Sequence, residues 1–204
     1  MSTTVAAAYP ADVAIERPAE SSRLWALLYV LFGIKVLALI LHFVIAFIWG
    51  IAAFVLFVIS QFVVLFTGAY PTGMHAFLTR FVRWSNQLNA WTWGLTDDYP
   101  PFVPTDDPFP METTVAYPDQ SSRLWAVLTI ILVKFLALVP HFIVLYVLGL
   151  VQAVLVWIAN LVILFTGDFP ESLFVFCVGV LRWQTRVTAF TLGLCDGYPP
   201  FSLS

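Results

Sequence analysis

Four long apolar stretches constrain this chain more than any other feature. Residues 43–66 and 142–165 hold no charged side chain, and the shorter stretches 24–41 and 124–139 hold a single lysine each. A hydrocarbon core about 30 Å thick is crossed by roughly 20 helical residues. The pattern therefore predicts four membrane-spanning helices.

Composition supports a membrane setting. The chain is 61% hydrophobic and only 10% charged, whereas soluble domains are about a quarter charged. The composition therefore disfavours a water-soluble fold. The net charge of −3 provides no field that would attract nucleic acid.

The chain repeats itself at an offset of 100 residues, which becomes 99 before residue 35. Ser-Ser-Arg-Leu-Trp-Ala occurs at 21–26 and again at 121–126, and Tyr-Pro-Pro-Phe closes each copy at 99–102 and 198–201. Such identity in one register indicates duplication. We expect an N-terminal tail (1–20), repeat 1 (21–102), a linker (103–120) and repeat 2 (121–204). The linker is rich in proline and acidic residues, so it is expected to be mobile or to lie along the surface.

Within each copy the two spans are expected to form a hairpin. The predicted tight turns lie at His42 and at Pro140-His141, because proline interrupts helices. An amphipathic helix then follows, over 72–95 and 171–194, with a Trp- and Phe-rich face beside an Arg-bearing face. This pattern is typical of a helix lying at the membrane surface, although packing on the hairpin as a core helix is the alternative. The predicted fold is an all-α membrane protein of two tandem repeats in parallel orientation.

Two spans per copy return the chain to the side on which it began. Both termini, the linker and the third helices are thus expected on one side, together with seven arginines: Arg17, Arg23, Arg80, Arg83, Arg123, Arg182 and Arg186. The positive-inside rule makes this side cytoplasmic.

Lys35 and Lys134 are candidate functional residues because a charge inside a span is costly. Each amine is expected to snorkel to the headgroups, lose its proton or meet a carboxylate of another subunit. The sharper hypothesis is that the pair binds an anionic lipid or a partner's acidic residue. His42 and His141 stand without nearby ligands, which favours interfacial turn residues over haem or metal ligation.

The full set of candidate lipid- or partner-binding residues is Lys35, Lys134, His42, His141, Arg80, Arg83, Arg182 and Arg186, with Trp25, Trp84, Trp91, Trp125 and Trp183 as interfacial aromatic anchors. We find no glycine-rich phosphate loop, metal-ligand spacing or nucleophile with its base. No catalytic, cofactor-binding or metal-binding residue is therefore predicted.

The sequence leads to a non-enzymatic membrane subunit or scaffold that docks to other membrane proteins or organises lipid. The alternative is a carrier or channel for a small anion or lipid, with both lysines in its site. No polar stripe runs the length of a span, and this disfavours a wettable path.

The order of motifs resembles bacterial domain-of-unknown-function family 4389. The resemblance is carried by Ser-Arg-Leu-Trp before a span, His at the hairpin, Phe-Thr-Gly at 66–68 and 165–167, Arg-Trp in the third helix and the closing Tyr-Pro-Pro-Phe. It covers nearly the whole chain, twice. It implies a bacterial inner-membrane protein and brings no established activity or functional residues.

Overall fold

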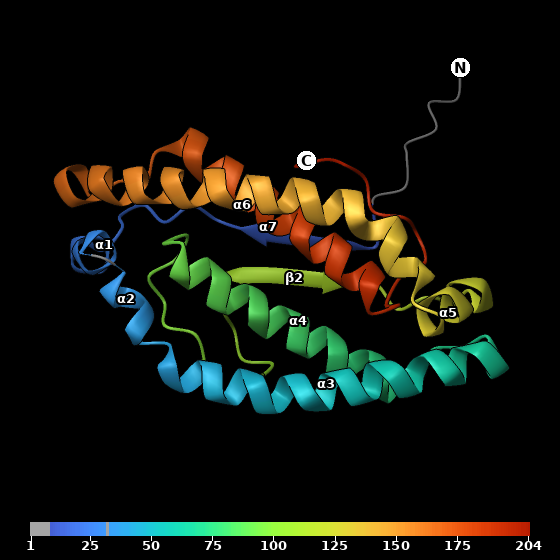
Figure 1. The fold of residues 1–204 in the computed structure, drawn as a ribbon. Coiled ribbons are helices and arrows are strands. Elements are labelled where there is room, and N and C mark those ends of the chain that lie inside the picture. The colour runs from blue at the N-terminus through green and yellow to red at the C-terminus, as the bar shows by residue number, and fades with distance from the viewer. Residues whose placement is uncertain (1–8, 32) are drawn as a thin grey trace, which may run out of the picture.

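The computed structural model describes residues 9–31 and 33–204 and is mostly helical (Figure 1). The elements, in chain order, are β1 (Ala11–Ile15), α1 (Arg23–Val30), α2 (Ile34–Leu37), α3 (Ile40–Thr67), α4 (Thr72–Thr92), β2 (Met111–Val115), α5 (Arg123–Ile130), α6 (Val133–Thr166) and α7 (Glu171–Thr191).

Three of these helices, α3, α6 and α7, are long and apolar enough to cross a membrane. They differ in burial. Only 17% of the most apolar window of α3 and 22% of that of α6 are buried in the protein, against 67% for α7. The long helices α3 and α6 therefore lie on the outside of the molecule, whereas α7 belongs to its interior.

The two copies are related by an approximate two-fold axis. Strands β1 and β2 pair antiparallel, with Val13 opposite Thr113 at the centre, and these two residues are equivalent in the repeat. The Asn86 side chain in α4 donates to the hydroxyl of its equivalent, Thr185 in α7, over 2.9 Å. The axis passes through both pairs, and α3 and α6 run in opposite directions on either side of it (Figure 1).

Each copy contributes its first helix to the other. Helix α1 packs against α6, and α5 against α3. The Ser21 N–H donates to the Gly167 carbonyl, and the Ser121 N–H to the Gly68 carbonyl. Gly68, at φ +74°, ends α3 in the left-handed conformation, and a methyl group there would lie 3.2 Å from the Arg123 Nε. This exchange explains why Phe-Thr-Gly and Ser-Ser-Arg recur together.

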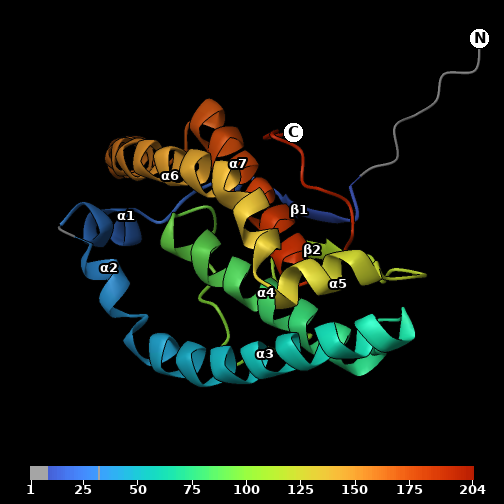
Figure 2. The ribbon, with the colours of Figure 1, turned by 45° about the vertical axis from the view of Figure 1, so that its right-hand side comes forward.

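The elements form three layers (Figures 1 and 2). The two-stranded sheet lies on one side, α4 and α7 cross in the middle, and α3 and α6 lie on the far side. The short helices α1 and α5 stand at opposite ends of the molecule. The core is split between two clusters of buried residues, one around Leu78 and Phe190 and the other around Leu95 and Phe169.

The predicted hairpin turns at His42 and Pro140-His141 are wrong. Helix α6 continues through Pro140, and α3 already includes His42. The chain instead turns earlier, at Leu31, Gly33 and residues 38–39 in the first copy and at 131–132 in the second, and Gly33 and Leu132 adopt positive φ. Helices α1 and α5 have 8 residues each, about 12 Å at 1.5 Å per residue. Segments 24–41 and 124–139 are therefore not continuous spanning helices.

The N-terminal tail and the linker are part of the fold, contrary to expectation. Residues 11–15 and 111–115 pair as the sheet, and the duplication therefore begins about ten residues earlier in each copy than the sequence suggested. The hydrogen bonds of the sheet form only when both segments meet, so neither segment alone carries a strong strand signal.

The third helices occur close to their predicted bounds but not at the surface. Trp84 is 1% exposed and Trp91 is fully buried, because the face of α4 that bears these tryptophans packs on the N-terminal part of the same repeat. Packing as core helices, the alternative to lying at the membrane surface, is what the structure contains.

Candidate functional site

The outer face of α3 and α6 carries many of the exposed large apolar side chains of the described residues. Phe47 and Phe54 on α3 are 71% and 64% exposed, and Tyr146 on α6 is 69% exposed. Many other apolar side chains on these helices are exposed too, including Phe43, Ile48, Ile51, Phe62, Ile143, Leu150, Val154 and Trp157. This exposed apolar face is larger than the apolar patches that monomeric soluble proteins expose to water.

Two apolar tips extend this face. At the end of α1 and in α2, Leu31, Ile34 and Leu37 are exposed, and Ile131 and Leu132 are exposed beyond α5. The tips begin at polar ends: Ser22 and Ser122 cap α1 and α5. Each tip thus runs from a polar boundary to an end at which the exposed side chains are apolar.

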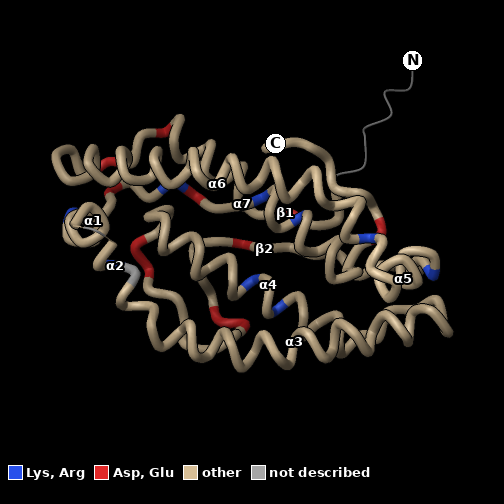
Figure 3. Tube along the Cα trace, viewed as in Figure 1, with Lys and Arg blue, Asp and Glu red and all other residues tan. Residues whose placement is uncertain are grey.

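Most charged residues lie outside α3 and α6 (Figure 3): α3 has none and α6 has Lys134 alone. Arg80 and Arg83 in α4 pair with Asp106 of the linker at 2.7 and 3.1 Å. The Asp106 pKa is lowered mainly by the hydrogen bond from Arg80. Within α3, residues 40–67, there is no charged residue.

The arginines of α7 anchor the sheet. Arg182 and Arg186 both pair with Asp12 of β1, and Arg186 donates to the carbonyl of Ser204. Arg186 also donates to the Ala11 carbonyl. These two arginines, predicted as candidates for lipid or partner binding, are engaged within the chain. Arg80 and Arg83 remain partly exposed.

Lys35 and Lys134 do not snorkel. Each is 1% exposed. The Lys35 ammonium donates to the Trp91 carbonyl at 2.6 Å and lies 4.4 Å from the centre of the Trp91 ring. The Lys134 ammonium lies 4.2 Å from the centre of the Phe190 ring. The end of α4 and the aromatic faces stabilise the positive charge, so neither amine is available to lipid or to a transported anion.

The histidines hold the closing Tyr-Pro-Pro-Phe segments. His42 stacks on Phe102 with ring centres 4.9 Å apart, and its ring Nε2 lies 3.2 Å from the Pro100 carbonyl. His141 stacks on Phe201 and accepts a hydrogen bond from the Trp183 indole. No cluster of three or more potential metal ligands occurs in residues 9–31 and 33–204. Both histidines lie inside helices, His42 in the first turn of α3 and His141 within α6.

Three of the five predicted aromatic anchors are wrong. Trp84, Trp91 and Trp183 are each less than 5% exposed and cannot reach lipid. Trp25 and Trp125 are partly buried and pack edge-on against Trp91 and Phe190. Trp84, Trp91 and Trp183 are buried because the helices that bear them, α4 and α7, form the middle layer.

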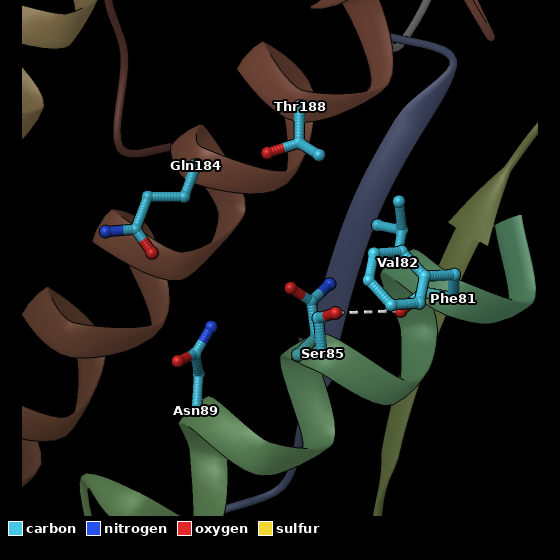
Figure 4. Close-up of a pocket in the computed structure, with 7 residues that line it drawn as sticks. Phe81, Val82, Ser85, Asn89, Gln184 and Thr188 are labelled. Carbon is cyan, nitrogen blue, oxygen red and sulfur yellow. Dashed lines mark hydrogen bonds between the residues drawn. The ribbon is translucent and has the colours of Figure 1, made fainter. Parts of the chain in front are cut away.

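A cleft lined by both polar and apolar side chains lies where α4 and α7 cross, on the two-fold axis (Figure 4). Its volume is about 230 Å³, and it is lined by Phe81, Val82, Ser85, Asn86, Asn89, Gln184 and Thr188. In Figure 4 the strands pass behind these side chains, so the cleft is on the side of the helices away from the sheet. It therefore opens between the apolar helices α3 and α6.

The cleft is lined by equivalent positions of the two copies. Ser85 matches Gln184 and Asn89 matches Thr188 at the offset of 99. Among the seven lining residues, the one hydrogen bond drawn joins the Ser85 hydroxyl to the Phe81 carbonyl. The sequence contains the signal, a polar pair one turn apart on the third helix of both copies. Only the crossing of α4 and α7 brings the two pairs together.

The fold and its surfaces define a duplicated, mostly helical protein with membrane-type helices. The chain belongs to the family described as domain of unknown function (DUF4389), whose model matches it twice, at residues 30–103 and 129–202. No curated protein and no solved structure matches it.

Proposed function

We propose that this chain is a non-enzymatic membrane scaffold that lies in one leaflet of the bilayer and organises the lipid around it. The two-fold axis stands along the membrane normal. Helices α3 and α6 lie in the plane of the leaflet, the two tips point toward the bilayer centre, and the sheet faces water. One observation carries the proposal: the exposed apolar residues of α3 and α6 and the sheet with its acidic residues Asp12 and Glu112 lie on opposite sides of the crossed helices α4 and α7.

The dimensions of the tips support insertion into one leaflet. Helix α1 has 8 residues, about 12 Å, and its capped end at Ser22 is the polar boundary. Half of a hydrocarbon core of about 30 Å is about 15 Å. A tip that starts at the headgroups thus ends near the bilayer centre and does not emerge on the far side.

The lengths of the long helices argue against crossing. Helix α6, with 34 residues, is about 51 Å long. To fit within about 30 Å of hydrocarbon it would tilt by more than about 50°, beyond the usual range of about 0–40°. Helix α3, with 28 residues, would tilt by about 44° on the same reasoning.

The sheet supports the same conclusion. If the antiparallel α3 and α6 both crossed the membrane, the axis relating them would lie in the bilayer midplane. The sheet is on that axis, together with Asp12 and its arginines. Open sheet edges exposed to hydrocarbon leave backbone groups without partners. Placing the axis along the normal puts these groups in water.

The family and the arginines support the location. The resemblance implies a bacterial inner membrane, and the arginines that surround the sheet favour the cytoplasmic side under the positive-inside rule. We therefore place the sheet and the linker at the cytoplasmic face. An insert confined to one leaflet displaces lipid on that side alone, and this is the physical basis of the proposed scaffold role. Other membrane proteins that bind the same leaflet are the expected partners.

Cysteine labelling tests the arrangement. The native Cys177 and Cys195 are buried, so the unmodified chain serves as the background control. Single cysteines replace Asp107 in the linker, Ile131 at a tip and Phe43 on α3, all of which are exposed on the protein. A membrane-impermeant maleimide is applied to spheroplasts and, separately, to inside-out vesicles.

Asp107→Cys should react with the maleimide only in inside-out vesicles. Ile131→Cys and Phe43→Cys should react from neither side until the membrane is dissolved in SDS. A nitroxide on Ile131→Cys should be reached by oxygen far more readily than by a water-soluble nickel chelate. Labelling of Phe43→Cys from the periplasmic side would establish a crossing hairpin and overturn the proposal.

A further inference from the structure

We infer that the axial cleft between α4 and α7 binds the neutral, hydroxyl-bearing headgroup of a lipid from the same leaflet. This inference rests on the proposed function, because it requires the cleft to open into the leaflet. The cleft is the polar feature of an otherwise apolar side: exposed side chains on α3 and α6 flank it, and its own lining holds two amides and two hydroxyls besides Asn86.

The chemistry of the lining selects an uncharged ligand. Ser85, Asn89, Gln184 and Thr188 offer hydrogen-bond donors and acceptors, and no charged side chain is among the lining residues. A phosphate group would be expected to meet arginine or lysine. The arginines of α4 and α7 are instead committed to Asp106 and to β1. Hydroxyl groups match amides and hydroxyls as both donors and acceptors.

The position of the cleft favours a polar occupant. Thr188 is exposed, and Ser85, Asn89 and Gln184 are only partly buried. In the leaflet, polar groups that face acyl chains without a partner are costly. Asn86, by contrast, turns away from the opening and bonds Thr113 and Thr185. A headgroup drawn into the cleft would satisfy the remaining groups while its acyl chains run along α3 and α6.

The size of the cleft fits a headgroup and not a whole lipid. Its volume of about 230 Å³ is below the roughly 300–1,000 Å³ of pockets that enclose drug-sized molecules. The glycerol hydroxyl of a diacylglycerol and the sugar of a glycosyl diacylglycerol share the required chemistry. The two sources differ in how many hydroxyl groups they bring.

Lipid binding to the full-length chain tests the inference. The chain is reconstituted in phosphatidylcholine nanodiscs doped with one probe: diacylglycerol, glucosyl diacylglycerol or phosphatidylglycerol. Retained lipid is counted by native mass spectrometry. The double variant Asn89→Leu with Gln184→Met removes two amides at nearly constant volume. Gln120→Met, on the exposed linker, is the matched control for the amide-to-thioether change.

The unmodified chain and Gln120→Met should retain a neutral hydroxyl-bearing lipid in preference to phosphatidylglycerol. The double variant should bind it roughly 25-fold more weakly, since it loses two hydrogen bonds and each is worth about a factor of five. Preference for the glucosyl lipid over diacylglycerol would identify a sugar as the ligand, and the reverse would identify the glycerol hydroxyl. Equal retention of the neutral and anionic probes, or undiminished binding by the double variant, would overturn the inference.

Maleimide labelling of the same samples separates the two proposals. If Ile131→Cys stays protected and Asp107→Cys stays one-sided while no neutral lipid is preferred, the headgroup inference fails and the leaflet scaffold stands. If Phe43→Cys labels from the far side, both fail.

Discussion

Removal of the Asn86 side chain should weaken the whole molecule, because this amide joins all the parts that meet on the two-fold axis. Its Nδ2 donates to the Thr185 hydroxyl at 2.9 Å and to the Thr113 hydroxyl at 3.2 Å. Asn86 is 5% exposed. One side chain in α4 thus connects α7 of the other copy to strand β2.

The magnitude follows from these contacts. Two buried hydrogen bonds contribute about 1 kcal/mol each, and the small cavity adds to the loss. The Thr185 hydroxyl keeps its bond to the Leu181 carbonyl at 2.8 Å, so it is not left without a partner. We expect Asn86→Ala to lower the free energy of unfolding by about 2–3 kcal/mol. At about 2–4 °C per kcal/mol for a chain of this size, Tm should fall by about 4–12 °C.

Thermal unfolding in detergent, followed by near-ultraviolet circular dichroism, measures the shift. A double-mutant cycle with Thr185→Ala should give a coupling of about 1 kcal/mol, because both variants remove the same bond. Thr188→Ala, on the same helix but exposed, is the control and should change Tm by less than about 2 °C. A loss for Asn86→Ala no greater than that of the control, or additivity with Thr185→Ala, would refute the axial arrangement.

Three further predictions concern stability and lipid. Burial raises the pKa of the Asp196 carboxyl, so the contribution of this group to stability is present at low pH and is lost as the pH rises from 3.8 through the raised pKa. Asp196→Asn should remove this part of the pH dependence of Tm measured from pH 3 to 7. An unchanged profile would contradict the prediction. Leu132 adopts φ +65°, and the equivalent residue of the first copy is Gly33. Leu132→Gly should relieve about 1 kcal/mol of backbone strain and raise the Tm measured in detergent. A fall in Tm would refute the strain argument. The double variant Lys35→Met with Lys134→Met should leave the amount of lipid retained in native mass spectra unchanged, because neither amine reaches the surface. The Trp91 carbonyl keeps its hydrogen bond from the Gly94 N–H. Loss of bound lipid would show that the lysines have a role at the surface.

The sequence alone determined the duplication, the apolar surface and the position of the third helices. These features are local: an uncharged run such as 43–66 is apolar whatever it packs against, and Gly68 and Gly167 end helices through their own backbone conformation. The amphipathic periodicity of 72–95 likewise depends only on helix geometry. Helix α4 ends within three residues of the predicted boundary.

The tertiary structure decided how these parts are placed. Whether Lys35 snorkels or is buried depends on the carbonyl of Trp91, which is 56 residues away in the sequence. Strands 11–15 and 111–115 exist only as a pair. Pro140 was expected to break a helix, yet α6 continues through it, because packing contacts along a long helix can outweigh one missing hydrogen bond. The cleft on the axis is lined by seven residues that α4 and α7 contribute from the two copies. Interactions between segments far apart in the sequence set all of these features. A local sequence pattern carries no information about which distant segment will pack against it.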